Sequence, residues 1–382
     1  MINCIDRIEQ LYEDRGQRAR ELKADGKGVI GYLCTFTPVE IITAAGLVPF
    51  RVTGSRQQSI TKAGTHLESI ACPFTRSVLD MALKGEYAFF DGFVMPHACD
   101  NIVKLYDLWS QNIEHSYGHF VNVPHTLSEP SMEFFEAELN TFKTSLERYT
   151  GKEISDEDLH GAIRLHNEQR SLVRQLYDFR RNAPPSLSGA ETIKIIIAAM
   201  SLPVNEANEL LKGVISEIGS RSPDQKANNG TRLMIHGTGI DNTTFIEMVE
   251  EAGGSVVIDD LCFGTRPYWY EVQSTDNPLA GIARNYLEGV NCPRTYRQSP
   301  GSHEEDLENR FGHIYKLASD FDVKGVIFHI LQYCDTHAFD IPDLKEYVEG
   351  KGLPVLTIEE DYPISSIARL KTRVEAFLEM IE

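Results

Sequence analysis

The sequence predicts an α/β protein with two parallel-sheet lobes and an additional helical layer between them along the chain. Strand-length apolar runs alternate with amphipathic helical patterns near both ends of the chain, and such alternation favours parallel sheets with right-handed crossovers. Residues 130–222 instead carry helical spacing with no clear strand pattern. With 382 residues, of which 42% are apolar, the chain is long and apolar enough to form more than one hydrophobic core. We divide the chain into 1–27 (an N-terminal helix), 28–129 (first α/β lobe), 130–225 (helical segment) and 226–382 (second α/β lobe).

The first lobe opens with a strand, a helix and a second strand within residues 26–54. We expect Thr37 to be the N-cap of this helix, with Pro38 at its first position, Glu40 as the capping-box partner and Gly46 as the stop. The remaining patterns of this lobe predict a helix over 72–85, a strand over 87–96, a helix over 101–112 and a strand over 116–124.

The rest of the chain continues in helices and then in a second alternation. Helical spacing covers 131–151, 155–182, 189–202 and 204–220. A polar hinge over 221–230 precedes the second lobe. There we expect strands over 231–237, 255–262, 324–335 and 353–361, with helices over 242–254, 341–352 and 365–382 among the connections.

Composition excludes some classes of partner. The formal net charge is −19 and no basic tract occurs, which argues against nucleic acid and against an anionic membrane surface. The chain contains no apolar run of membrane-spanning length, and its first 26 residues form a charged amphipathic pattern rather than a signal peptide. We therefore expect a cytoplasmic protein.

The seven cysteines give the strongest chemical signal. They lie at scattered positions in a chain without a secretory signal, and an odd number of them argues against a disulfide framework. Four come at or just beyond the ends of expected strands and Cys72 begins a helix; the four are Cys34, Cys99, Cys262 and Cys334. Parallel sheets bind ligands beyond the carboxyl ends of their strands, so several thiols are expected in one cleft, where they would hold an iron–sulfur cluster or zinc. The alternative is that each is a core residue.

Six segments together resemble the 2-hydroxyacyl-CoA dehydratase / benzoyl-CoA reductase superfamily nearly end to end. They are "GYLCTFTPVEIITAAGLVPFRV", "CPFTRSVLD", "MPHACDNIVKLYDLW", "DDLCFGTRPYW", "QYCDTHAFDIPDLK" and "GLPVLTIEEDYPISSIARLKTRVEAF". The resemblance implies two flavodoxin-like lobes and a [4Fe–4S] cluster held by Cys72, Cys99 and Cys334, with one iron left open. A double-cubane branch with an [8Fe–9S] cluster uses more thiolates, which makes additional ligands possible at Cys34, Cys262 and Cys292.

The resemblance also implies a reaction and its partners. The chain is similar to the smaller subunit of heterodimeric dehydratases, which eliminate water from a 2-hydroxyacyl-CoA to give an enoyl-CoA through a ketyl radical. A homologous second subunit and a separate ATP-hydrolysing iron–sulfur activator would complete the system. This chain contains no P-loop motif, so no ATP site is expected in it. A benzoyl-CoA reductase subunit, a double-cubane reductase and a non-catalytic scaffold subunit stay open as alternatives.

Several neighbours of the cysteines are candidates for supporting roles. Cluster potential depends on groups around the ligands, and the candidates for this role or for proton transfer are Thr35, His97, Asp100, Asp335 and His337. Helix capping by the two aspartates, and structural roles for the histidines, are the alternatives. Coenzyme A phosphates need local basic residues, for which Lys104 and Arg266 are the candidates.

A competing interpretation is a nicotinamide dehydrogenase. The segment "LMIHGTGIDNTTFIEMV" combines a strand, a G-x-G turn and a helix, and Asp259 and Asp260 follow about twenty residues later. Asn242 occupies the position of the third small residue of that motif. This interpretation also leaves the strand-end cysteines unexplained.

Overall fold

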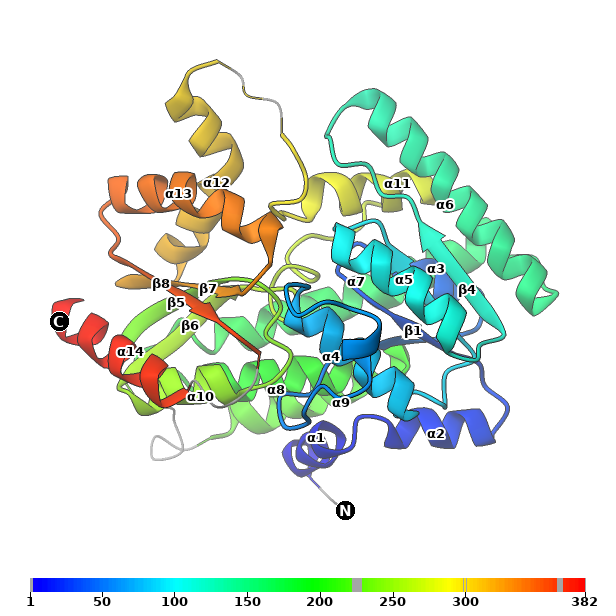
Figure 1. Ribbon diagram of the computed structural model, residues 1–382, viewed down its shortest axis with the longest axis horizontal. Coiled ribbons are helices and arrows are strands. Elements are labelled where there is room, and N and C mark those ends of the chain that lie inside the picture. The colour runs from blue at the N-terminus through cyan, green and yellow to red at the C-terminus, as the bar shows by residue number, and fades with distance from the viewer. Residues whose placement is uncertain (1–2, 222–228, 298, 300, 363–366, 382) are drawn as a thin grey trace.

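The computed structural model describes residues 3–221, 229–297, 299, 301–362 and 367–381. Over these residues the chain forms two four-stranded sheets with the strand orders β2-β1-β3-β4 and β6-β5-β7-β8, and all pairs are parallel. Helices flank both sheets (Figure 1). This confirms the predicted fold class. The strands are β1 (Val29–Tyr32), β2 (Val48–Arg51), β3 (Gly92–Pro96), β4 (Tyr117–Val121), β5 (Thr231–Gly237), β6 (Gly254–Asp260), β7 (Gly325–Leu331) and β8 (Val355–Glu360).

The N-terminal segment forms two helices where the sequence predicts one. The helical pattern is interrupted at Gly16, between the two helices. Gly16 lies so close to the ring of Phe89 that a Cβ at this position would come within 3.1 Å of it. Among the described helices none is long and apolar enough to cross a membrane. The helices of the first half are α1 (Cys4–Glu13), α2 (Gln17–Ala24), α3 (Val39–Ala44), α4 (Pro73–Lys84), α5 (Asp100–Asn112), α6 (Glu129–Thr150) and α7 (Asp156–Asp178).

Helix α3 begins differently from the prediction. Its N-cap is Pro38, and the Thr37 hydroxyl instead donates to the carbonyl of Leu33 at 2.6 Å, which closes the turn after β1. Glu40 does not cap the helix either, because its buried carboxylate accepts from Arg170 of α7 at 2.5 Å. A buried guanidinium without a carboxylate partner would cost more free energy than a helix N-terminus without a side-chain cap.

The helical layer attaches to both lobes. Helices α8 (Gly189–Ala199) and α9 (Val204–Gly219) follow α7, and capping boxes start α7 at Ser155 and α8 at Ser188. Helix α7 packs against α3 of the first lobe, whereas α8 packs against β6 and α10 (Thr244–Glu251) of the second lobe. The layer therefore contributes to the cores of both lobes.

The second lobe differs from the prediction at its third strand. Strand β7 ends at Leu331 rather than at 335, and α13 begins at Asp335, so Pro342 lies inside the helix instead of at its start. Residues 222–228 of the predicted hinge, and 365, 366 and 382 of the predicted last helix, lie outside the described residues. The helices of this lobe are α10 (Thr244–Glu251), α11 (Pro278–Arg284), α12 (His303–Asp320), α13 (Asp335–Gly350) and α14 (Ile367–Ile381).

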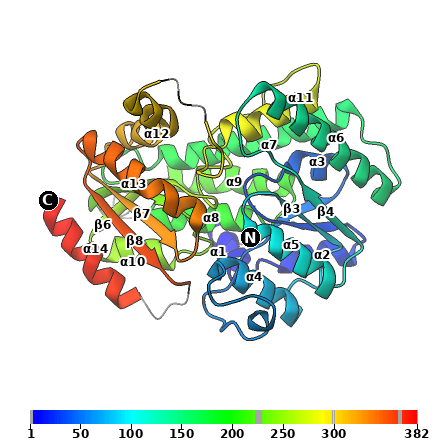
Figure 2. The same cartoon turned by 45° about the horizontal axis from the view of Figure 1, so that its top comes forward.

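The carboxyl ends of the two sheets face each other, as the loops that follow the strands show. Just beyond β2, the backbone N–H of Gly54 donates to Asp241, which follows β5, at 2.7 Å. Tyr362, just beyond β8, donates its hydroxyl to the same carboxylate at 2.6 Å. Figure 2 shows the two groups of strands on opposite sides of the molecule. Residues that follow strands in either lobe therefore meet in the region between the lobes.

Candidate metal centre

Three cysteines each stand at the first residue before a helix. Cys72 is the N-cap of α4, Cys99 of α5 and Cys334 of α13. We call these residues the first thiol set. The N-terminus of a helix favours negative charge, because its backbone N–H groups lack partners and the helix dipole is positive there. These positions are therefore suited to thiolates that bind a metal.

The members of the first thiol set influence one another's ionisation. Burial raises the pKa of Cys99 to about 11, and the Cys72 thiolate contributes to the shift. Burial also raises the pKa of Cys334 well above its usual range, with Cys72 and Cys99 adding to the shift. Three thiols that oppose one another's ionisation will be protonated until a cation is present. A metal that binds here must displace their protons.

The other three thiols of the interlobe region form a second thiol set of Cys34, Cys262 and Cys292. Burial raises the pKa of Cys34 to about 11, with Cys262 as the next cause. Burial likewise raises the pKa of Cys292 to about 12, and Cys262 and Cys34 add to that shift. The sets are neighbours, since Cys99 acts on the pKa of Cys34 and Cys292 acts on that of Cys334. We therefore treat the six thiols as one candidate group.

The remaining cysteine is remote from this group. Cys4 lies in α1 against Gly213 of α9, and its backbone N–H donates to Glu217 at 2.7 Å. Burial raises the pKa of Cys4, and Glu217 raises it further. Its position is structural, which makes it a natural control for the other six.

Backbone strain is concentrated at the thiol-bearing turns. Of the three non-glycine residues with positive φ among the described positions, Cys34 (φ 61°) and Tyr333 (φ 61°) belong to these turns and Asp322 does not. A non-glycine residue in this region costs about 1–3 kcal/mol, and such strain is typical of functional sites. The strained Cys34 lies in the turn after β1, and the strained Tyr333 directly precedes Cys334, the N-cap of α13.

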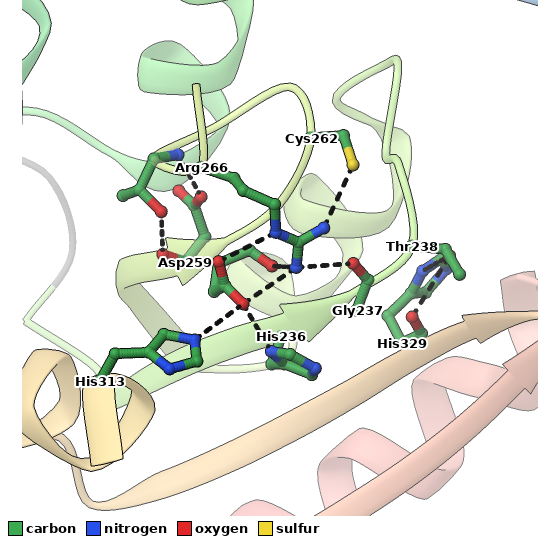
Figure 3. Close-up of polar contacts among 10 residues, drawn as sticks. His236, Gly237, Thr238, Asp259, Cys262, Arg266, His313 and His329 are labelled. Atoms are coloured by element: carbon green, nitrogen blue, oxygen red, sulfur yellow. Dashed lines mark hydrogen bonds and ion pairs between the residues drawn. The ribbon is translucent and has the colours of Figure 1, made fainter. Parts of the chain in front are cut away.

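The guanidinium of Arg266 donates to a cysteine sulfur, so it is not free to bind a phosphate group of coenzyme A. Its Nη1 donates to Sγ of Cys262 at 3.1 Å, while Nε and Nη2 donate to the Asp260 carboxylate at 3.2 and 2.9 Å (Figure 3). The same carboxylate lies 2.8 Å from Nδ1 of His236. The guanidinium is buried and engaged on both sides, and this geometry does not support the expected role in binding coenzyme A. Lys104 is exposed on α5, and its expected role stays a prediction.

Some buried polar atoms without hydrogen-bond partners belong to residues that closely follow a cysteine. They include Oγ1 of Thr35, Nδ1 of His337 and Nε of Arg294, which belong to residues one to three positions after Cys34, Cys334 and Cys292. Such orphaned atoms are rare in folded proteins. Sulfide and thiolate sulfurs of a bound cluster would accept hydrogen bonds from them. The donor set therefore fits an iron–sulfur cluster.

A single metal ion fits less well. Among the described residues no group of three or more His, Cys, Asp or Glu side chains is placed to hold one ion. An iron–sulfur cluster instead distributes its thiolates over several irons, so its ligands need not converge on one point.

The other predicted neighbours occupy varied positions. Asp100 and Asp335 are exposed in the first turns of α5 and α13, where a carboxylate complements the helix dipole. His97 packs edge-on against His125 with 4.7 Å between ring centroids. His337 is buried, and burial lowers its pKa well below the usual range, with Arg266 adding to the shift.

Cys292 of the second thiol set lines a cavity of about 410 Å³. Arg294, His236, Asp260 and His313 also line this cavity. Nε2 of His313 is 3.8 Å from Oδ2 of Asp260, too far for a hydrogen bond, and has no hydrogen-bond partner. The volume lies in the range of small-ligand sites.

Sequence reasoning missed Arg294, His236 and His313. They come from the segment after Cys292, from β5 and from the middle of α12, so only the folded chain brings them to the cysteines. The one local signal is the proximity of Arg294 to Cys292 in "NCPRTYR".

The dinucleotide interpretation does not fit the site. Asp259 accepts from the hydroxyl of Tyr177 and from the backbone N–H of Thr265. Asp260 is paired with Arg266 and His236. Neither carboxylate is left for a ribose hydroxyl, and the G-x-G turn is followed by Asp241, which holds the lobes together.

The fold defines a two-lobed α/β protein in which loops that follow the strands of both lobes are in contact. Residues 34–381 match the family described as 2-hydroxyglutaryl-CoA dehydratase, D-component. The chain belongs to this family, which confirms the resemblance seen in the sequence.

The curated relatives match over nearly their full length. The (R)-phenyllactyl-CoA dehydratase beta subunit of Clostridium sporogenes is 25% identical, with 95% of this chain and 94% of the relative covered. A benzoyl-CoA reductase subunit of Thauera aromatica is 27% identical, with 94% and 92% covered. The putative dehydratase subunit YjiM of Escherichia coli strain K12 is 29% identical, with 94% and 93% covered.

Proposed function

We propose that this chain is the iron–sulfur subunit of a 2-hydroxyacyl-CoA dehydratase, which eliminates water from a 2-hydroxyacyl-CoA to give an enoyl-CoA. The observation that supports the proposal is that Cys72, Cys99 and Cys334, the first thiol set, each stand at the N-terminus of a helix. The names of the relatives, several of which are dehydratase subunits, support the reaction class.

Three thiolates from this chain would hold a [4Fe–4S] cluster and leave one of its four irons without a protein ligand. When bound, such a cluster supplies a single electron at low potential to the acyl thioester, and the open iron serves as a Lewis acid. The helix N-termini stabilise the thiolates. Thr35, Arg294 and His337 would direct their unpartnered polar atoms at its sulfurs.

The 410 Å³ cavity is the proposed chamber for the acyl end of the substrate. His313 reaches this chamber with an imidazole that forms no hydrogen bond through Nε2. Histidine is the side chain that enzymes use most often to accept and donate protons. His313 is therefore the proposed proton-transfer group, in place of His97, which is turned towards His125.

The proposed reaction needs partners. The relatives named as beta subunits support a heteromer with a homologous second subunit. The sequence contains no P-loop, so a separate ATP-hydrolysing iron–sulfur activator would deliver the electron. Acyl-CoA substrate, activator and partner subunit would all meet this chain in the cytoplasm.

Replacement of single cysteines tests the proposal. Cys334→Ala, prepared without exposure to oxygen, should lose the cluster or hold it weakly, because one of three ligands is gone. Cys4→Ala is the matched control and should keep the iron content and spectrum of the wild type. Unchanged iron in the Cys334 variant would refute the ligand assignment. A scaffold subunit would behave differently, since the cysteine variants would then lose electron supply without losing substrate binding by the heteromer.

A second candidate function is favoured by the second thiol set. Cys99 of the first set affects the pKa of Cys34, Cys292 affects that of Cys334, and Arg266 donates to the sulfur of Cys262. Six thiols are enough for an [8Fe–9S] double cubane, which would make the chain a reductase of small molecules rather than a dehydratase. About four irons per chain favour the dehydratase or a benzoyl-CoA reductase subunit, and about eight favour the double-cubane reductase.

A further inference from the structure

Arg294 is a buried cation at the edge of the thiol group. It follows Cys292 by two residues and is 6% exposed. Its Nη1 donates to the carbonyl of Pro124 at 2.6 Å, and Nη2 donates to those of His97 and Val123 at 2.8 and 2.9 Å. The guanidinium is thus fixed to the segments that follow β3 and β4.

Among the residues that the structure describes, no carboxylate is hydrogen-bonded to Arg294. Within the described part of the chain its contacts are neutral carbonyls and the ring of Phe36, whose centroid lies 4.7 Å from the guanidinium carbon. Its Nε has no hydrogen-bond partner at all. A buried cation without a counter-ion is strongly unfavourable. The structure therefore needs an anion next to Arg294 that the carboxylates do not provide.

Thiols that ionise when a metal binds would supply this negative charge. Arg294 follows Cys292 by two residues, and its Nη2 donates to the carbonyl of His97, two residues before Cys99. Its guanidinium carbon also lies 4.7 Å from the ring centroid of Phe36, two residues after Cys34. Cys292 and Cys34 belong to the second thiol set and Cys99 to the first. The cation therefore stands within electrostatic reach of both sets.

We propose that Arg294 is a positioning residue of the iron–sulfur site, which anchors the segment carrying Cys292 and supplies the counter-charge for thiolates of both sets. The inference rests on the proposed function. The consequence is electrostatic: a cluster gains one negative charge on reduction, and a fixed cation stabilises that charge. Arg294 thus raises the reduction potential of the bound cluster.

The test is a one-electron titration of the loaded protein with dithionite, monitored by electron paramagnetic resonance. Arg294→Gln should make reduction about tenfold less favourable, a fall of about 59 mV in midpoint potential. Arg297→Gln is the matched control, because Arg297 lies three residues on and donates to the Glu288 carbonyl and Asn291. Its potential should equal that of the wild type.

A second variant separates charge from structure. Arg294→Lys keeps the cation without the guanidinium fork, so its potential should stay close to that of the wild type even if Arg294→Gln fails to fold. A fall as large in the lysine variant, or equal potentials in the glutamine variant and the wild type, would overturn the inference. Both results leave the iron–sulfur proposal standing. A wild-type chain that binds no iron would instead refute both.

Discussion

Arg56 and Glu360 form a buried ion pair that joins the two lobes. Nη1 and Nη2 of Arg56 donate to the two carboxylate oxygens at 2.5 and 3.1 Å, and the side chains are 2% and 0% exposed. The second oxygen also lies 2.5 Å from Nε2 of His329 in β7. The pair holds together the two lobes that carry the cysteines.

Removal of one partner should destabilise the protein strongly. Arg56→Met leaves the Glu360 carboxylate buried without its guanidinium partner, and such losses cost about 3–5 kcal/mol. Arg164→Ala is the control, because its pair with Glu157 is 67% and 80% exposed and should cost less than about 1 kcal/mol. Denaturant unfolding measures both, and equal losses would contradict the role of the buried pair.

The same pair predicts how stability depends on pH. Burial raises the pKa of Glu360, but hydrogen bonds from His329 and Arg56 outweigh burial and leave the pKa below its usual value. A lowered pKa contributes stability above the unfolded value of about 4.3, and that stability is lost as the pH falls through the folded pKa. The free energy of unfolding should therefore drop below about pH 4.3, with a shallower drop in Glu360→Gln. Parallel pH profiles would refute this.

His313→Gln should lower turnover without changing the metal site. Loss of a proton-transfer group costs about 10²–10⁴-fold in rate, whereas the iron content and spectrum should match the wild type. His303→Gln provides the control on the same helix, because His303 is exposed and its ring contacts Glu346 on the surface. Wild-type turnover in the His313 variant would remove this residue from the mechanism.

The two thiol sets predict different results in a cysteine series. If the chain holds a double cubane, Cys262→Ala should lower the iron content from about eight towards about four per chain. If it holds a single cluster on the first thiol set, the same variant should keep about four irons. Iron analysis of Cys262→Ala beside Cys334→Ala therefore distinguishes the two candidate functions.

The sequence predicts those parts of the fold and site that depend on local pattern. Alternating strands and helices indicated the two parallel sheets, and cysteines at strand ends indicated a shared site. Local patterns do not reveal interactions between distant segments. Glu40 pairs with Arg170 instead of capping α3, and Arg266 donates to Cys262 and Asp260. The role proposed for Arg294 likewise depends on its hydrogen bonds to carbonyls after β3 and β4, which only the folded chain shows.

The most direct test of the proposed function is iron and acid-labile sulfide analysis of the wild-type chain, purified without oxygen, with electron paramagnetic resonance of the reduced protein. We expect about four or about eight irons per chain with matching sulfide and a cluster signal on reduction. A chain without iron under these conditions would show that the six thiols are core residues, and it would contradict the proposed function.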